Sequence, residues 1–442
     1  MVRPSVRATR HRARPDHELQ GTSRDPAPMN RIDPISLPAL AALQATPLVI
    51  RANPAGGFLA YLDFSEVFEP SLATPGETFR RLSPRAMDET LSFSGWIGFF
   101  GYEFLATHLG LDLRASRDVD VPSGWFARPR TIIHLHADKT LIESTLPDRA
   151  KDLASSLASF SAQREANRKT GDKSITCNLS FEQYEGIFSR AREAILDGET
   201  YQIKISQRFE SSNGIDPLLS FDRLCTANPA PEAFLLHTEE FSIISCSPEV
   251  VIDRKGNEIV TRPIGGTYER DKLQSDKSAI ERFLRDPKEI AEHNMLVDLE
   301  RNDLSTVCIP GSVTIDRFRE VESYAHLHHL VSTIRGTLRE GTDLPSLLQA
   351  MLPGGSITGC PKIRTMEWID RLEPCFRGPY TGSFGIISDD GDLRLNLIIR
   401  SMLMTGGRCY AQAGGGIVVD STPDYEYNEN KIKARALLDL MA

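Results

Sequence analysis

The sequence predicts a mixed fold in which antiparallel β-sheet is combined with α-helices. Apolar, β-branched runs follow one another through short turns in two stretches, "EVVIDRKGNEIVTRPI" (249–264) and "GSFGIISDDGDLRLNLIIRSMLMTGGRCYAQAGGGIVVD" (382–420). Their turns, R-K-G-N, D-D-G-D and T-G-G-R, are typical of hairpins. Strands joined directly by hairpins pair antiparallel, so a doubly wound nucleotide-binding fold is disfavoured.

Helical segments are expected at 180–197, 287–302, 343–352, 361–372 and 423–441. Two of them begin with the same signal, a capping residue followed by proline, at Asp286-Pro287 and at Thr422-Pro423. Earlier in the chain, strand-like runs include "FSGWIGFFGYEF" (93–104) and "TIIHLHA" (131–137).

The chain of 442 residues is long enough for one large domain or two ordinary ones. The polar stretch 160–177 has few apolar residues and is interpreted as a linker or long loop. It separates a region at 35–150 from a longer region at 177–438. Residues 1–34 begin with an arginine-rich stretch, which we interpret as a disordered tail or a start assigned too early, with Met29 in place of Met1.

Composition excludes several classes of protein. A net charge of -9 argues against a nucleic-acid surface, which usually carries a basic patch. No apolar run approaches the roughly 18 residues of a membrane helix. The seven cysteines include no C-x-x-C pair, which suits free thiols in a reducing cytosol and gives no zinc signature. We therefore expect a cytoplasmic protein that binds neither nucleic acid nor membrane.

Two carboxylate pairs stand in the first turns of the two capped segments. Glu289 and Glu292 are three residues apart, as are Glu426 and Glu429, so each pair shares a helix face. Taken singly, each pair suits a solvated surface: Glu289 is the N3 partner of a capping box, and Lys433 follows Glu429 by four. Together they suggest a site for a hard cation such as Mg²⁺, which favours a few carboxylates, waters and an anionic substrate.

Glycine-rich segments offer backbone donors for an anion. "GGSITGCPKIR" (354–364) has the glycine spacing of a phosphate loop, but Cys360-Pro361 stands where lysine and serine or threonine are required, which disfavours ATP or GTP hydrolysis. Its Ser356 and Thr358 remain possible donors. "QAGGGIVVD" (412–420) suits an anion nest or, equally, a bulge at a sheet edge.

Three further groups are candidates for chemistry. Arg400 lies in an apolar run, predicted as strand, and such a cation requires a carboxylate partner from protein or ligand. Glu249 begins a hairpin strand, where a partly buried carboxyl could be a general acid. In "AHLHHLVST" (325–333), His329 is a candidate donor, whereas His326 and His328 suit core positions and the spacing is not that of metal ligands.

In order along the chain, these segments resemble the chorismate-utilising enzymes. The resemblance covers residues 177–438 most strongly, and 35–150 is similar to the less distinctive N-terminal region of that family. The motifs that carry it are "GETYQIKISQRF", "SPE", "RPIGGT", "AEHNMLVDLERNDL", "HHLVSTIRG", "PGGSITGCPKIR", "GPYTGSFGIIS", "AGGGIV" and "YEYNENKIKA". The resemblance implies an α+β fold with antiparallel β-sheets packed face to face and helices outside.

The resemblance also implies roles for the acidic pairs. Glu292 and Glu429 match direct Mg²⁺ ligands, and Glu289 and Glu426 match residues that act through water. Lys433 lies beside this site. Because the metal ion inverts the local charge, an acidic protein could bind the dicarboxylate chorismate there.

Other matched positions would hold or act on the substrate. Gly266 and Thr267 would meet the ring carboxylate. The enolpyruvyl carboxylate would be held by Tyr380, Arg400 and the amides around Gly415 and Gly416. Glu249 matches the general acid near the departing C4 hydroxyl, and His329 would support that oxygen.

The expected reaction follows from the nucleophile. Family members that add water carry a general-base lysine where this chain has Gln202, and a neutral amide cannot take a proton. Ammonia would come from a separate glutamine amidotransferase. "SITG" and "AGGGIV" are more similar to the branch that makes 4-amino-4-deoxychorismate, toward 4-aminobenzoate and folate, than to anthranilate synthase component I.

One residue keeps the alternative product open. Many aminodeoxychorismate synthases carry a lysine that attacks C2 where this chain has Gly265, and anthranilate synthases carry alanine. We therefore expect amination without a covalent lysine adduct. Anthranilate synthesis, toward tryptophan, is the alternative, and a non-catalytic homologue that only binds chorismate is a third. "PISLPAL" (35–41) is weakly similar to a segment that binds a structural tryptophan in some relatives, so tryptophan binding stays open.

Overall fold

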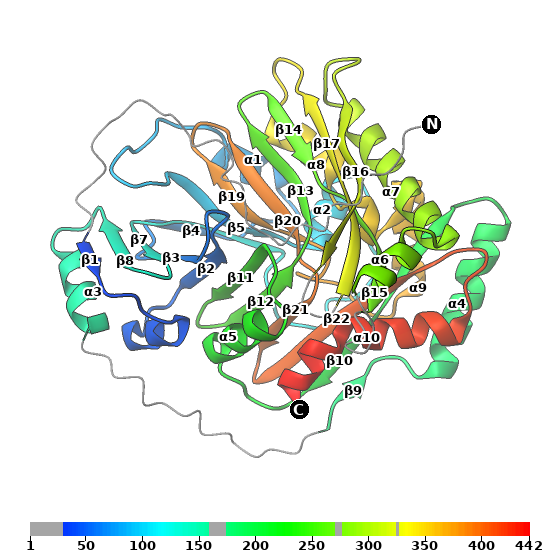
Figure 1. The fold of residues 1–442 in the computed structure, drawn as a ribbon, viewed down its shortest axis with the longest axis horizontal. Helices are drawn as coiled ribbons and strands as arrows, with labels where there is room; N and C mark the ends of the chain where they lie inside the picture. Colours follow the sequence, from blue (N-terminus) through cyan, green and yellow to red (C-terminus); the bar gives the residue numbers. More distant parts are fainter. Residues whose placement is uncertain (1–29, 159–173, 270–275, 324–326) are drawn as a thin grey trace.

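The computed structural model describes residues 30–158, 174–269, 276–323 and 327–442 (Figure 1). Residues 1–29, His326 and most of the stretch interpreted as a linker lie outside these ranges. All seven cysteines are free thiols. None of the helices in the described ranges has the apolar length needed to cross a bilayer.

The described strands form two antiparallel sheets. The first has twelve strands within the described ranges, with β9 (Thr176–Cys177) paired to β10 at one side. Its order is β1 (Asn30–Ile32), β8 (Thr140–Ser144), β7 (Thr131–Leu135), β3 (Phe58–Leu62), β2 (Leu48–Ala52), β11 (Glu232–His237), β12 (Phe241–Ser247), β21 (Ser401–Thr405), β22 (Arg408–Ile417), β10 (Gln202–Ser211) and β18 (Gly359–Cys360).

The second sheet has ten strands in the same ranges, with β16 (Thr314–Ser323) paired to β17. Its order is β15 (Ile264–Glu269), β17 (Leu327–Thr337), β14 (Glu258–Thr261), β13 (Val250–Lys255), β20 (Leu393–Leu397), β19 (Ser383–Ser388), β5 (Gly95–Phe100), β6 (Gly124–Arg128) and β4 (Glu66–Phe68). Strands from both halves of the sequence therefore take part in both sheets.

The two sheets pack face to face. Phe234 of β11 stacks on Phe384 of β19 with ring centroids 3.7 Å apart, and both side chains are buried. Ile243 of the first sheet and Ile97 of the second belong to the same apolar core. Burial of such side chains is the main stabilising contribution to a fold of this kind.

Helices cover the outer faces. The first sheet packs against α3 (Arg149–Ala158), α5 (Pro217–Ala227), α10 (Pro423–Met441) and the 3₁₀ helix η1 (Leu37–Leu43). The second packs against α1 (Pro75–Arg81), α2 (Tyr102–His108), α7 (Pro287–Ser305) and α8 (Leu344–Met351). At one end α4 (Phe181–Leu196) and α9 (Lys362–Leu372) pack on β10 and β22, and α6 (Asp276–Phe283) precedes α7. The expected α+β fold, with face-to-face antiparallel sheets and outer helices, is confirmed.

Several local predictions are confirmed, and others are wrong. The hairpins β13–β14, β19–β20 and β21–β22 use the turns expected for them, and all five expected helices are present. However, the run 93–104 is not wholly strand: β5 ends at Phe100, and the chain enters α2 at Tyr102. Thr422 occupies the N-cap position of α10, but its side chain makes no capping hydrogen bond.

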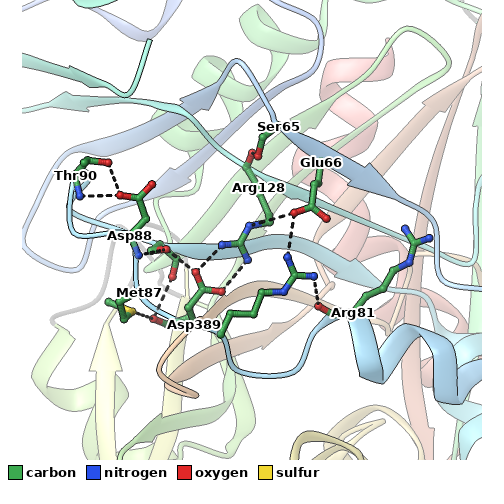
Figure 2. A network of polar contacts seen from close by, with 11 residues as sticks. Ser65, Glu66, Arg81, Met87, Asp88, Thr90, Arg128 and Asp389 are labelled. Atoms are coloured by element: carbon green, nitrogen blue, oxygen red, sulfur yellow. Dashed lines mark hydrogen bonds and ion pairs between the residues drawn. The ribbon is translucent and has the colours of Figure 1, made fainter. Parts of the chain in front are cut away.

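A polar network joins the N-terminal strands to the β19–β20 turn (Figure 2). Arg128 of β6 donates two hydrogen bonds to Asp389, at 2.7 and 2.6 Å, and Ser94 donates a third at 2.5 Å. The Asp389 side chain is only 1% exposed. Glu66, by contrast, is about half exposed where it pairs with Arg85.

We expect Arg128→Met to lower the free energy of unfolding by about 1.5–3 kcal/mol, because it removes two hydrogen bonds from a buried carboxylate. Arg85→Met, which breaks an exposed pair, should cost less than about 1 kcal/mol. Urea unfolding of both variants measures the difference. Equal losses would show that the Arg128–Asp389 pair does not behave as a buried one.

Candidate active site

The motif residues gather where β10, β22, β15, α7 and α10 meet at one end of the two sheets (Figure 1). α7 packs against β15, and α10 packs against β22. Gln202 and Lys204 are two residues apart on β10, so their side chains lie on the same face of the sheet. β10 pairs with the glycine-rich end of β22, where Lys204 lies opposite Gly416. Positions that are far apart in the sequence are therefore carried by elements that pack against one another.

Each acidic pair begins a helix, as expected. The amide of Glu289 donates to Asp286 at 3.3 Å, so the predicted cap of α7 is confirmed. At α10, Ser421 rather than Thr422 contacts the first turn: its hydroxyl donates to Glu426 at 2.7 Å. Burial, reinforced by the neighbouring Glu429, raises the pKa of Glu426.

Lysines accompany the other two glutamates. Lys204 donates to Glu292 at 3.2 Å, and the amide of Gln202 donates to the same oxygen at 3.4 Å. Lys433 donates to Glu429 at 2.9 Å. Burial raises the pKa of Glu292, but Lys204 and Lys433 outweigh this effect and hold it below its ordinary value.

The four glutamates share one electrostatic environment. The phenol of Tyr425 has its pKa raised to about 12 by burial and by the charges of all four: Glu429, Glu289, Glu426 and Glu292. Within the described ranges, however, no three carboxylate, imidazole or thiol groups converge closely enough to hold an ion as they stand.

This donor set still fits Mg²⁺ chemically. The ion prefers oxygen ligands, keeps several waters and is often held by only one or two carboxylates together with the substrate, so it does not need a closed protein cage. Glu292 and Glu429, each paired with a lysine, would be the direct ligands of the ion. Glu289 and Glu426 would lie beside them. The metal site predicted from the sequence stays a prediction.

Glycines let the backbone approach these carboxylates. Gly266 forms a bulge in β15 with φ of 68°, and a Cβ there would lie 2.7 Å from Glu289 Oε2. A Cβ on Gly415 would lie 2.7 Å from Glu426 and 3.0 Å from Glu429. Larger residues would displace the acidic groups at both positions. The backbone of Thr267 lies opposite His329, and its side chain lies outside the described part.

Glu249 is a buried carboxyl between β12 and β13. Its side chain accepts a hydrogen bond from Ser356 at 2.7 Å, and the residue is 4% exposed. Burial raises the pKa of Glu249 to about 7, outweighing Ser356, Lys204, the Ile264 amide and Arg400, which all favour the charged form. A carboxyl that still holds its proton near neutral pH can act as a general acid.

His329 and Arg400 form a directed pair. His329 Nδ1 donates to the Gly266 carbonyl at 3.0 Å, and its Nε2 accepts from Arg400 Nη2 at 2.7 Å. Burial, followed by the Arg400 charge, lowers the pKa of His329 to about 3, so the ring is neutral. The sequence suggested that Arg400 lies in a strand, but this prediction is wrong. Arg400 lies in a bend between β20 and β21, with φ of 49°.

Two other predicted positions are also placed. A Cβ on Gly414 would lie 3.1 Å from the Tyr380 hydroxyl, so Tyr380 lies against the same glycine run as Gly415 and Gly416. His328 contacts Ser323 at 2.8 Å through Nδ1 and is buried, as the core interpretation expected.

Gly265 faces helix α7. A Cβ at this position would lie 2.9 Å from His293 Nδ1 and 3.0 Å from Leu296 Cδ1, and His293 is buried and hydrogen-bonded to Ser332 at 2.7 Å. The absent side chain is therefore explained by close packing of α7 on β15. In this chain a lysine at 265 would collide with α7.

Gly265→Ala should lower the free energy of unfolding by about 1–3 kcal/mol through overpacking, and Gly265→Lys should lower it further. Gly186→Ala, on the exposed face of α4 with no atom within 4 Å of the added methyl, is the matched control and should stabilise by up to about 1 kcal/mol. Thermal unfolding measures both. A Gly265→Ala variant as stable as the parent would contradict the packing explanation.

Sequence reasoning missed two features of the site. Lys204 lies two residues after Gln202, and strand alternation alone puts both on one face. The buried Glu373–Arg377 pair is the second feature. Arg377 donates to the backbone carbonyls of Lys204 and Ile357, at 2.9 and 3.2 Å, and so holds the backbone of β10 next to the site. Its spacing of four residues was visible, but nothing in the sequence distinguished it from a surface ion pair.

Comparison with known proteins defines the class. Residues 62–439 match the family described as chorismate binding enzyme. The chain therefore belongs to the chorismate-binding enzyme family.

Similar curated proteins carry two different names, aminodeoxychorismate synthase and anthranilate synthase. It is 42% identical over 249 residues to aminodeoxychorismate synthase component 1 of Bacillus subtilis, an alignment that covers 56% of this chain and about half (53%) of that relative's length. It is 36% identical over 355 residues to anthranilate synthase component 1 of Thermus thermophilus, covering 78% of this chain and 77% of the relative. The crystal structure of anthranilate synthase component I from Streptococcus pneumoniae superposes with a TM-score of 0.75 at 26% identity, covering 95% of each chain. Membership of the family therefore indicates an enzyme that acts on chorismate, but it does not decide which product the enzyme makes.

Proposed function

We propose that this chain is the synthase subunit that converts chorismate and ammonia to 4-amino-4-deoxychorismate in the presence of Mg²⁺. The ammonia would come from a glutamine amidotransferase partner. The observation that supports amination is Gln202, a neutral amide beside Glu292 on the strand where water-adding members carry a general base. The similarity to the Bacillus subtilis relative and the "SITG" and "AGGGIV" segments favour amination at C4.

In this proposal the leaving group is the C4 hydroxyl. Glu249 donates its proton as the C4–O bond breaks, so the hydroxyl departs as water. Ammonia forms the new C–N bond and then loses a proton, which Glu249 can take back. His329, kept neutral by burial and by the charge of Arg400, would add no positive charge of its own near the departing oxygen.

The remaining groups would bind the two substrate carboxylates. Backbone donors at Gly266 and Thr267 would meet one of them. Tyr380, Arg400, Gly415 and Gly416 would meet the other. When bound, Mg²⁺ would neutralise the acidic cluster and let a dianion approach it. Lys433 adds a further positive charge at Glu429.

The alternative product is anthranilate, as the name of the Thermus thermophilus relative would indicate. Gly265 favours this alternative because the chain has no lysine nucleophile at this position. Both reactions remove the hydroxyl with the same acid, so the fate of the enolpyruvyl group separates them.

Product analysis tests the proposal. Purified protein is incubated with chorismate, MgCl₂ and ammonium chloride, and the products are resolved by liquid chromatography and mass spectrometry. We expect an aminated product that retains its enolpyruvyl group and gives 4-aminobenzoate only after aminodeoxychorismate lyase is added. Fluorescent anthranilate with an equal amount of pyruvate would replace the proposal by the alternative. Unchanged chorismate would support a homologue that binds without turnover.

A further inference from the structure

Lys204 brings a positive charge into the acidic cluster from the sheet side. Its ammonium lies 3.2 Å from Glu292 Oε1, and its side chain is 12% exposed. It projects from β10 on the same face as Gln202, opposite Gly416. A Cβ on Gly416 would lie 2.7 Å from Lys204 Nζ, so the glycine leaves the room that this ammonium occupies.

Lys204 is not confined to one partner. Besides Glu292, the charges of Glu429 and Glu426 on α10 act on it. In an exposed ion pair the ammonium would contact one carboxylate in water, and the pair would contribute little to stability because solvent and salt screen it. Here a single ammonium stands between acids from two helices, in a partly dry environment where charge interactions are stronger.

The charged side chains around this position leave a net negative charge. The four glutamates contribute four negative charges, and Lys204 and Lys433 contribute two positive ones. The difference, two negative charges, equals the charge of one divalent cation. Lys204 already donates to Glu292, a carboxylate that would also hold the ion, so the ammonium and a divalent cation would meet at the same group.

We propose that Lys204 is a built-in counter-cation that competes with Mg²⁺ for Glu292. It holds this carboxylate in place in the metal-free protein and must give it up, wholly or in part, when the ion binds. Lys204 is thus a positioning residue that sets the Mg²⁺ concentration at which the site fills. This inference rests on the Mg²⁺ site of the proposed function, but not on which product the enzyme makes.

Mg²⁺ titration of charge variants tests this competition. Lys204→Met removes the charge and keeps the apolar stem, and Lys204→Gln removes the charge but can still donate to Glu292. We expect Mg²⁺ to bind each neutral variant about tenfold more tightly than the parent, measured by isothermal titration calorimetry without chorismate. Lys204→Arg, which keeps the charge, should retain an affinity close to the parent's.

A second readout separates competition from simple structural support. Without metal, Lys204→Met should unfold at a lower temperature than the parent, and saturating Mg²⁺ should recover most of that loss. Lys431→Met is the matched control, because Lys431 lies on the same helix as Glu429 but is exposed over the Tyr427 ring. It should change neither quantity.

The outcomes are distinguishable from a failure of the proposed function. Unchanged or weaker Mg²⁺ binding in both neutral variants would overturn the competition. If the neutral variants bind Mg²⁺ more tightly but the enzyme makes anthranilate, the proposed function fails and the competition between Lys204 and Mg²⁺ stands. If the parent binds no Mg²⁺ and neither neutral variant gains binding, the inference fails together with the metal site.

Discussion

Glu249→Gln should lower kcat by about 10²- to 10⁴-fold while chorismate binding is kept, because the variant removes the proton donor without changing the shape of the side chain. The site is built to keep that proton. Glu249 is buried and accepts a hydrogen bond from the Ser356 hydroxyl, and burial raises its pKa to about 7. Steady-state kinetics with ammonium, together with chorismate binding by calorimetry, separates loss of chemistry from loss of binding.

The pH dependence gives an independent check on the same group. A general acid must be protonated, and Glu249 loses its proton as the pH rises through about 7. With ammonia concentration held constant, kcat should therefore fall on the alkaline side of that value, and this limb should disappear in Glu249→Gln.

Ser356→Ala provides the control for the Glu249 prediction. It removes a hydrogen bond that favours the charged carboxylate, so the pKa of Glu249 should rise further and the alkaline limb should move to higher pH. Activity should change far less than in Glu249→Gln. A Glu249→Gln variant with kcat within about threefold of the parent would remove Glu249 from the chemistry.

The sequence predicted the parts of this site that follow from local rules. Asp286 and Pro287 start α7, and the three-residue spacing then puts Glu289 and Glu292 on one face. Turn residues predicted the hairpins, and through them the antiparallel sheets. These features depend on interactions between residues close in the chain, which is why a single sequence carries them.

The remaining features depend on contacts between distant segments. Gly265 looked like a missing nucleophile, yet its environment is set by His293, whose side chain comes from α7 and fills the available space. Arg400 looked like a strand residue because its neighbours are apolar, but the bend that aims it at His329 follows from its place between β20 and β21, which pair in different sheets. No local pattern shows which two segments will meet.

Arg377→Met should be among the most destabilising single changes in the chain, lowering the free energy of unfolding by about 3–5 kcal/mol. Both side chains of the Glu373–Arg377 pair are nearly inaccessible, at 3% and 2% exposure. The guanidinium donates twice to Glu373, at 2.8 Å each. Removing Arg377 leaves a buried carboxylate whose remaining donors are the Ser206 amide and hydroxyl, at 2.7 and 2.8 Å.

A double-mutant cycle identifies the source of that loss. If the cost comes from the uncompensated Glu373 charge, then Arg377→Met/Glu373→Met should be more stable than Arg377→Met alone, with a coupling of about 0.5–3 kcal/mol in urea unfolding. Full recovery is not expected, since the carbonyls of Lys204 and Ile357 also lose their donor. A double variant no more stable than Arg377→Met would assign the loss to those carbonyls instead. Because one of them belongs to the residue that holds Glu292, that outcome would make Arg377 chiefly a support for the strand that carries Lys204 into the acidic cluster.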